Sequence, residues 1–235
     1  MALRLEAVSF DVADASAAGT FWAELLNREI RVESGGVMVP GDSAQVGLRF
    51  VTSRAEPVGR PRLHLHLTSS SPEDQQRTVA TVLRLGGRHL DVGQTGDEGF
   101  VVLADPQGNE LCVIEPGNSY LAGTGDLGEV TCEGSRAAGL FWCEALGWPL
   151  VWDEDQQTAI QSPRGGTKIA WDVWYPAPDD PGLQKDRQRF DLLSADPDAE
   201  VQRLQRLGAT VLTRYPHCVE LTDPDGTRFC LRHDR

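Results

Sequence analysis

The chain has few of the features that mark membrane, nucleic-acid-binding or disulfide-stabilised proteins. No apolar run approaches the ~20 residues that a membrane-spanning helix needs, and no charged start followed by an apolar stretch suggests a secretory signal. Lysine and arginine number 22 against 35 aspartates and glutamates, so the net charge is −13. A surface of that sign disfavours nucleic acid and anionic lipid as partners. The five cysteines form no CxxC pair, which fits a reduced cytoplasmic protein better than a disulfide framework.

Common nucleotide-binding and nucleophile motifs are also missing. No GxGxxG opens a helix after a strand, no GxxxxGK[ST] occurs, and no GxSxG places a serine on a sharp turn. Acid–base chemistry by carboxylates stays open, because Asp11, Asp172 and Asp191 fall on expected strands. With 235 residues, 40% of them hydrophobic, the chain is long enough for one large or two ordinary domains.

What the sequence does contain is a long internal repeat. The stretch ADPQGNELCVI at 104–114 returns as TDPDGTRFCLR at 222–232, and each copy joins two apolar runs through an Asp-Pro-x-Gly turn. A cysteine follows at the same place in both copies, at Cys112 and Cys230. FWAELLN likewise returns as FWCEALG, and RLGGRHL as RLGATVL, at an offset of about 120 residues. A constant offset of this kind indicates a tandem duplication.

Each half of the chain is itself expected to contain two modules of one strand, one helix and three further strands. Apolar alternation predicts the first strand of a module. Asp14 is expected to cap the first helix, whose apolar residues at i, i+3, i+4 and i+7 are Ala18, Phe21, Trp22 and Leu25, and Ser71 is expected to cap the second. The modules are expected at about 3–52, 62–115, 127–175 and 187–232. A stretch rich in glycine and small polar residues at 116–126 separates a first domain, 1–117, from a second, 124–235. A longer loop is expected at 176–188.

These motifs and their order resemble the glyoxalase/bleomycin-resistance/dioxygenase group, also called the vicinal oxygen chelate superfamily, and in particular its tandem glyoxalase-like members. The resemblance implies an α+β fold in which four βαβββ modules form two tandem domains with curved mixed β-sheets around cavities. It is less specific for function, because the superfamily includes lyases, isomerases, extradiol dioxygenases, thiol transferases and metal-free antibiotic-binding proteins.

In catalytic members of this group a divalent metal is held by His or Gln and Glu on the first and last strands of each module. In the first domain these positions fall on Ala7, on Leu48 or Arg49, on His64 and on Cys112. Only the last two have donor atoms that suit a transition metal. A two-ligand site for zinc, nickel or iron at His64 and Cys112 therefore stays an alternative.

In the second domain the equivalent positions are Leu127, Trp171 or Asp172, Arg189 and Cys230. Neither domain supplies the three oxygen or imidazole donors that a hard cation needs. We therefore expect no metal cofactor. The two domains also differ in chemistry at one aligned position, where His66 of the first domain corresponds to Asp191 of the second.

The leading functional hypothesis is a metal-independent protein that binds a cationic or aromatic small molecule, since acidic and aromatic residues favour such ligands. The alternative is a metal-dependent lyase, isomerase or dioxygenase that uses His64 and Cys112, with His66 on the same strand face. The candidate ligand-binding residues are His64, His66, Cys112, Arg49, Trp171, Asp172, Arg189 and Asp191, with Trp174 as a further aromatic residue. Simple core packing is the competing interpretation of the histidines, cysteines and tryptophans. The fused modules are expected to form a monomer by internal pairing, or a homodimer.

Overall fold

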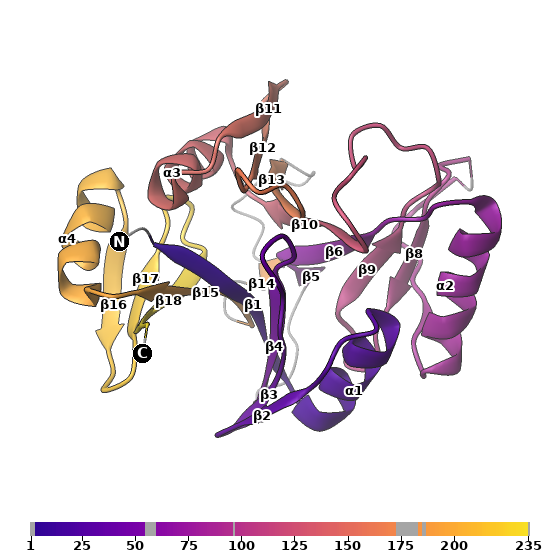
Figure 1. The fold of residues 1–235 in the computed structure, drawn as a ribbon, viewed down its shortest axis with the longest axis horizontal. Helices are drawn as coiled ribbons and strands as arrows, with labels where there is room; N and C mark the ends of the chain where they lie inside the picture. Colours follow the sequence, from indigo (N-terminus) through magenta and orange to yellow (C-terminus); the bar gives the residue numbers. More distant parts are fainter. Residues whose placement is uncertain (1–2, 55–59, 96, 173–182, 185–186, 235) are drawn as a thin grey trace.

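The computed structural model describes residues 3–54, 60–95, 97–172, 183–184 and 187–234. Its described part contains two eight-stranded mixed sheets, a two-stranded ribbon and four helices (Figure 1). Trp174 and most of the loop expected at 176–188 lie outside the described residues. The expected α+β fold with four βαβββ modules in two tandem domains is confirmed, although the exact domain limits stay a prediction.

Sheet I combines the first and the fourth module. Its strands, in spatial order, are β16 (Thr210–Arg214), β17 (Val219–Thr222), β18 (Arg228–His233), β15 (Gln188–Ser194), β1 (Arg4–Val12), β4 (Gly47–Thr52), β3 (Gly36–Val39) and β2 (Arg31–Glu33). The two modules meet at β1 and β15, which pair antiparallel.

Sheet II combines the second and the third module. Its strands, in spatial order, are β11 (Leu150–Glu154), β12 (Gln157–Gln161), β13 (Lys168–Asp172), β10 (Leu127–Glu133), β6 (Leu63–Leu67), β9 (Glu110–Val113), β8 (Val101–Ala104) and β7 (Arg88–His89). Each sheet is therefore shared between the two domains, and so is the ribbon of β5 (Arg60–Pro61) and β14 (Leu183–Gln184). This arrangement corrects our grouping of the candidate site residues by domain.

The helices are α1 (Ala15–Leu25), α2 (Pro72–Arg84), α3 (Arg136–Leu146) and α4 (Pro197–Leu207). Each begins at a side chain that accepts a hydrogen bond from a backbone N–H of the first turn, at Asp14, Ser71, Ser135 and Asp196. The apolar face predicted for the first helix is buried in the core. None of the four described helices is long and apolar enough to cross a membrane.

The repeated sequence motifs hold the two modules of each domain together. The indole N–H of Trp22 on α1 donates to Asp105 in the first Asp-Pro-x-Gly turn at 3.0 Å, and Trp142 on α3 donates to Asp223 in the second turn at 3.0 Å. Burial raises the pKa of both carboxyls, and these hydrogen bonds act in the opposite direction. The Phe-Trp pair and the turn thus form one structural unit, which confirms core packing as the role of the tryptophans in this motif.

Candidate functional site

Alternation along the strands of sheet I separates a core face from an inner face, which we define as the face opposite the helices. On β1, Val8 and Phe10 lie in the hydrophobic core, so Ser9 and Asp11 point to the inner face. On β15 the register places Asp191 opposite Ala7 and Arg189 opposite Ser9. The charged residues of sheet I therefore gather at the seam between the two domains.

Arg49 on β4 lies at the centre of this cluster. Its guanidinium contacts Glu6 at 2.8 Å, Glu33 at 2.8 Å, and Asp191 at hydrogen-bonding distance. The Arg49 side chain is only 5% exposed. Burial disfavours its charge, but the hydrogen bond to Glu33 and the charges of Asp191 and Glu6 outweigh burial and raise the pKa of the guanidinium.

Asp191 is fully buried and receives positive charge from several directions. Arg232 lies 3.4 Å from its carboxylate and Arg189 lies 3.8 Å away, while Ser9 donates a hydrogen bond to it. Arg189 also pairs with Asp11 at 2.9 Å. The inner face of sheet I is therefore a network of arginine–carboxylate pairs, and a pocket of about 390 Å³ opens above it.

The inner face of sheet II has a different centre, the carboxylate of Glu129 on β10. It accepts hydrogen bonds from Tyr120 at 2.6 Å and Thr131 at 3.0 Å, and His66 Nδ1 lies 2.8 Å from it. Burial would raise the pKa of Glu129, but the hydrogen bonds of His66, Tyr120 and Thr131 lower it. Glu129 is therefore a buried, charged carboxylate.

The two histidines of β6 have opposite protonation states. Burial disfavours the protonated form of His66, but hydrogen bonds to Cys112 and Glu129 and the charge of Glu129 raise its pKa to about 10. Burial and the neighbouring charge of His66 lower the pKa of His64 to about 3. His66 is thus a cation paired with Glu129, and His64 is a neutral imidazole whose ring centre lies 5.0 Å away.

A pocket of about 260 Å³ opens beside these histidines. Its lining includes His64, His66, Phe100, Val102, Cys112, Ile114, Glu98 and Glu110. The sheet register places Cys112 on β9 next to His66, and Val102 on β8 next to Cys112. The structure therefore brings His64, His66 and Cys112 together, as the sequence analysis expects, and adds an apolar wall.

The other sequence-derived candidates separate into different environments. Arg49, Arg189 and Asp191 meet in sheet I. Trp171 is 1% exposed and stacks on Trp142 with ring centres 6.4 Å apart, so it is a core residue and lines no site. Asp172, at the end of β13, accepts a hydrogen bond from Gln157 at 2.9 Å.

Glu129 is absent from the sequence-derived candidates because the position of β10 equivalent to Ala7 was expected at Leu127, whereas the register pairs Ala7 with Asp191 and Glu129 with His66. Glu6 is absent because it lies at a β-bulge of β1. The register shifts between Leu127 and Glu129 on β10, and between Leu5 and Ala7 on β1. The bulge turns Leu127 into the core and directs Glu129 to the inner face. Gly128 lies inside strand β10, and a glycine at such a position was the one sequence signal for the bulge in this strand.

Neither inner face has a donor set that fits the divalent metal implied by the family resemblance. In sheet I the carboxylates already face guanidinium groups of the chain. In sheet II the Glu129 carboxylate already accepts three hydrogen bonds, and a protonated His66 has no free lone pair to donate to a metal. Within the described ranges, no group of three or more His, Cys, Asp or Glu side chains could hold a metal ion.

Comparison with known proteins agrees with this architecture. The profile named Glyoxalase-like domain matches the chain twice, over residues 7–114 and 129–232. The chain therefore belongs to the glyoxalase-like domain family. No functionally curated protein matches it at the sequence level.

Solved structures show the same fold at low sequence identity. Glyoxalase I from Zea mays has a TM-score of 0.68 and 13% identity, over 98% of this chain and 92% of that one. A putative dioxygenase from Bacillus subtilis subsp. subtilis str. 168 has a TM-score of 0.60 and 12% identity, over 99% and 86% of the two chains. At these identities the similarity establishes the fold and leaves the chemistry to the site itself.

Proposed function

We propose that this chain is a metal-independent small-molecule-binding protein whose ligand is a small aromatic compound with a neutral or positively charged polar group. The observation that carries this proposal is the state of the two inner faces. The buried carboxylate at the centre of each inner face is paired with a cation from the chain itself, Asp191 with Arg49 and Glu129 with His66. The charged centres therefore act as parts of the scaffold, and the pocket beside them acts as the binding site.

The pocket next to His64 has the composition of an aromatic-binding site. Phe100, Val102 and Ile114 give it apolar walls, and Cys112 adds a polarisable sulfur. Its volume of about 260 Å³ is just below the roughly 300–1,000 Å³ of pockets for drug-sized ligands. A compound of one or two rings fits this size.

Polar groups at the edge of the pocket favour a particular orientation of such a ligand. Glu98 and Glu110 place carboxylates in the lining. One oxygen of Glu98 accepts hydrogen bonds from Thr95 N at 2.8 Å and Thr95 Oγ1 at 2.9 Å, and the negative charge of both carboxylates attracts a positive charge on a ligand. The neutral imidazole of His64 also lines the pocket. We therefore infer that the ring system enters between Phe100 and Ile114 and that an ammonium group stays near the two glutamates.

The competing function is a metal-dependent lyase, isomerase or dioxygenase centred on His64 and Cys112. The observation in its favour is that the low pKa of His64 keeps its imidazole neutral, as a metal ligand must be. Two protein ligands would then have to hold zinc, nickel or iron with ligand or water atoms in the remaining positions.

The test of the binding function is calorimetric titration with 2-naphthylmethylammonium. We expect saturable binding at one site, weakened about fivefold by Glu110→Gln through loss of one charge contact. Glu154→Gln, at the exposed tip of β11, removes the same charge elsewhere and serves as the control. Equal affinity of both variants and the parent protein would contradict the assigned pocket.

Metal content distinguishes the two functions. Under the proposal, protein purified with added zinc, nickel or iron retains none of them in stoichiometric amount, measured by elemental mass spectrometry. One metal per chain that disappears in His64→Ala would instead establish the enzyme alternative.

In keeping with the internal pairing of the four modules, we propose that the protein is a cytoplasmic monomer. Light scattering would measure its mass in solution, and a homodimer is the alternative outcome.

A further inference from the structure

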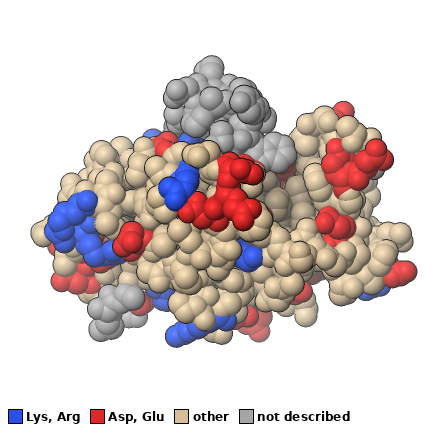
Figure 2. Space-filling view, turned by 90° about the horizontal axis from the view of Figure 1, so that it is seen from above, with Lys and Arg blue, Asp and Glu red and all other residues tan. Residues whose placement is uncertain are grey.

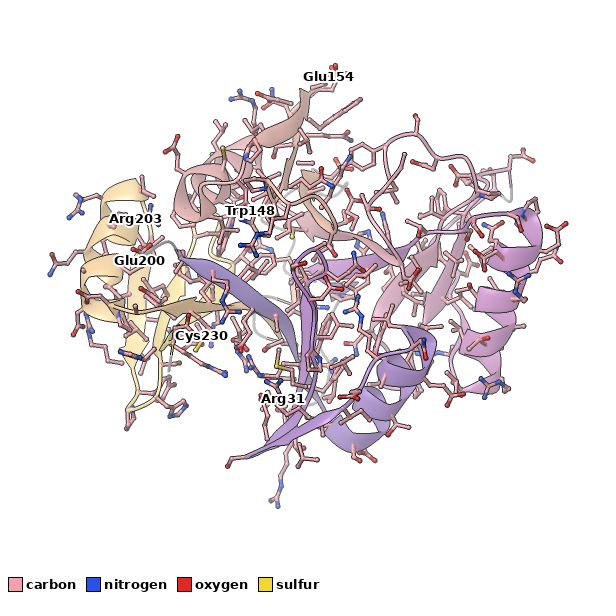
Figure 3. The ribbon with its side chains drawn as sticks, viewed as in Figure 1. Arg31, Trp148, Glu154, Glu200, Arg203 and Cys230 are labelled. Carbon is pink, nitrogen blue, oxygen red and sulfur yellow. The ribbon has the colours of Figure 1, made fainter. Side chains whose placement is uncertain are left out.

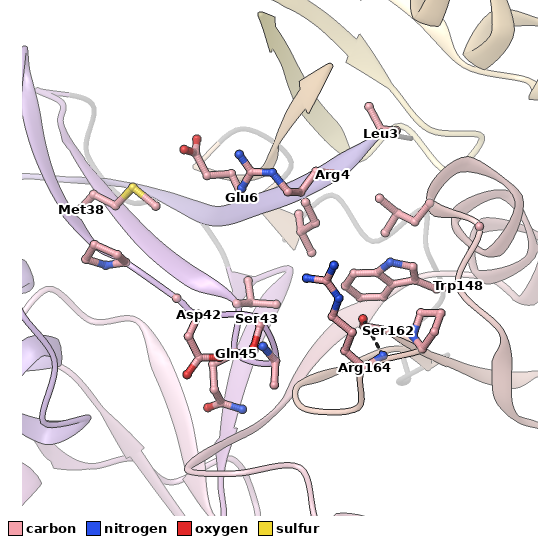
Figure 4. Close-up of a pocket in the computed structure, with 18 of the residues that line it drawn as sticks. Leu3, Arg4, Glu6, Met38, Asp42, Ser43, Gln45, Trp148, Ser162 and Arg164 are labelled. Atoms are coloured by element: carbon pink, nitrogen blue, oxygen red, sulfur yellow. Dashed lines mark hydrogen bonds between the residues drawn. The ribbon is translucent and has the colours of Figure 1, made fainter. Parts of the chain in front are cut away.

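A second pocket lies between the two domains, away from His64 and Cys112. It has a volume of about 630 Å³ and opens between β1 and β3 of the first domain and the end of α3 of the second (Figure 4). Figure 4 shows Arg4 and Glu6 on one side, Met38 and Asp42 on another, and Trp148 and Arg164 opposite them. Arg31 and Trp148 come from different domains, as Figure 3 also shows.

Hydrogen bonds within the loop at 40–46 and to the second domain hold this loop, which forms one wall of the pocket. The carboxylate of Asp42 accepts hydrogen bonds from the backbone N–H groups of Ala44 at 2.7 Å and Gln45 at 2.8 Å. The Gln45 side chain accepts from Leu127 N at 3.0 Å and donates to Thr124 O at 2.5 Å. The loop of one domain is therefore tied to the first strand of the other.

A second set of hydrogen bonds joins the loop at 40–46 to the second domain through Thr167. Thr167 N donates to Ala44 O at 2.9 Å, and the Thr167 hydroxyl accepts from Val46 N at 3.2 Å. At Gly166 a Cβ would lie 1.7 Å from Ala44 O, so the two backbones are in close contact. The pocket is consequently preformed, which reduces the ordering cost of binding.

The walls combine apolar surface with unpaired positive charge. Leu3, Leu5, Leu146 and the half-buried Trp148 give apolar and aromatic surface. Arg31 and Arg164 also line the pocket and are exposed, and neither guanidinium has an ion pair or hydrogen bond to another described residue. Arg4 pairs with Asp234 at 3.3 Å, but both groups are about half exposed.

The acidic residues of the lining do not cancel this charge. Glu6 is paired with Arg49 in sheet I, and the carboxylate of Asp42 is occupied by two backbone N–H groups, which lower its pKa. Two guanidinium groups without an ion pair to another described residue therefore line a pocket of mixed polar and apolar surface, in a protein whose net charge is −13. On the face shown in Figure 2, basic residues lie beside acidic ones on the left and centre, and mainly acidic residues appear on the right.

We propose that this interdomain pocket binds an aromatic carboxylate, with its ring system against Trp148 and its carboxylate between Arg31 and Arg164. A guanidinium presents a planar fork of N–H donors that matches a carboxylate, and an indole face suits a flat ring. The pocket volume of about 630 Å³ falls within the roughly 300–1,000 Å³ usual for such ligands. The site differs from the one beside His64 in position and in the sign of the ligand charge.

The test uses two probes with one ring system and opposite charges, 2-naphthoate and 2-naphthylmethylammonium, in calorimetric titrations of the full chain. Arg31→Gln and Arg164→Gln should each weaken naphthoate binding about fivefold, and the double variant should weaken it at least tenfold. Arg206→Gln, an exposed arginine of α4 outside the pocket, removes the same charge and should leave the affinity unchanged.

The result that overturns this inference is naphthoate binding that is absent, or that the Arg31 and Arg164 variants leave unchanged while circular dichroism shows them folded. Trp148→Phe provides a second measurement, because quenching of tryptophan fluorescence by naphthoate should decrease in this variant. Glu110→Gln separates this site from the one beside His64, since it should weaken the ammonium probe and leave naphthoate affinity unaltered. The experiments can therefore contradict the proposal for one binding site and still support the proposal for the other.

Discussion

The inner faces of the two sheets occupy equivalent positions in a duplicated fold, yet their chemistry differs. Sheet I pairs a fully buried aspartate, Asp191, with arginines, whereas sheet II pairs Glu129 with a histidine, a tyrosine and a threonine. In the first arrangement the neighbouring carboxylates raise the pKa of the Arg49 guanidinium, so its central cation stays charged. The second contains a group that titrates, because the pKa of His66 is about 10.

The parts that hold the fold together did not diverge in this way. Trp22 contacts Asp105 and Trp142 contacts Asp223 through the same hydrogen bond, with the same length of 3.0 Å. Core positions are constrained by close packing, while an inner face needs only to balance its buried charges. The comparison thus separates conserved packing from variable chemistry within one chain.

The largest expected effect comes from removing the central cation of sheet I. Arg49→Met leaves Asp191, Glu6 and Glu33 without their shared partner, and we expect a loss of ~3–5 kcal/mol in the free energy of unfolding, measured by urea denaturation. Arg136→Met removes a solvent-exposed pair with Asp153, whose charges water screens, and should cost far less. A similar small loss in both variants would show that the sheet I network does not stabilise the fold.

Sheet II should instead show a stability that depends on pH. The folded pKa of His66, about 10, lies above its ordinary value of 6.5, so its protonated form stabilises the folded state. This contribution is complete below pH 6.5 and is lost as the pH rises through 10. The difference in unfolding free energy between the parent protein and His66→Gln, on the order of a few kcal/mol at pH 6.5, should therefore shrink toward pH 10.

Several groups around His66 bear on that measurement. Glu129, Tyr120, Cys112 and Lys168 face it or its partner, and Lys168 also titrates in the alkaline range. The same pH series in Lys168→Met serves as the control, since it retains His66 and should keep its slope. A difference between parent and His66→Gln that is constant from pH 6.5 to 10 would contradict the assignment of a protonated His66.

The hydrogen bond from a helix tryptophan to the aspartate of the Asp-Pro-x-Gly turn occurs in both domains, so its loss should lower stability equally in each. Trp22→Phe and Trp142→Phe each leave a buried carboxylate without one donor, which should cost ~1–3 kcal/mol of stability in chemical denaturation. Trp152→Phe changes an indole that is 38% exposed and should be nearly neutral. Clearly unequal losses at Trp22 and Trp142 would indicate that the motif has separate roles in the two domains.

The smallest effect concerns the thiols. A hydrogen bond with Cys230 lowers the pKa of Cys218 despite partial burial, and Arg232 acts in the same direction, whereas burial raises the pKa of Cys143. Both thiols are partly exposed. We expect iodoacetamide to label Cys218 several-fold faster at neutral pH, as peptide mass spectrometry would measure. Faster labelling of Cys143 would contradict this order.

Much of the fold followed from local sequence patterns. The repeated Asp-Pro-x-Gly turns have Gly108 and Gly226 at φ of 85° and 79°, as their position in the turn requires. The capping residues Asp14 and Ser71 begin their helices where the sequence predicts. These features could be predicted because each depends on residues a few positions apart.

The candidate site was predictable only in part. His64, His66 and Cys112 share a face because alternation on β6 and the parallel register with β9 bring them together. Glu129 and Glu6 depend on β-bulges, and a shift of one residue exchanges the two faces of a strand. Tyr120 lies in the stretch expected to be a linker, and its hydrogen bond to Glu129 depends on how that segment folds back on the sheet.

The four modules and their order could be predicted from the amino-acid sequence, because periodicity and turn chemistry are local properties. Which modules share a sheet depends on long-range contacts and became apparent in the three-dimensional fold. The first strand of a module could pair with the first strand of a module in its own domain or in the other domain, since antiparallel hydrogen bonds between backbones carry little sequence information. The pairing of the first module with the fourth and of the second with the third places Arg49 beside Asp191 and His66 beside Glu129, and so creates both charged centres from residues of both domains.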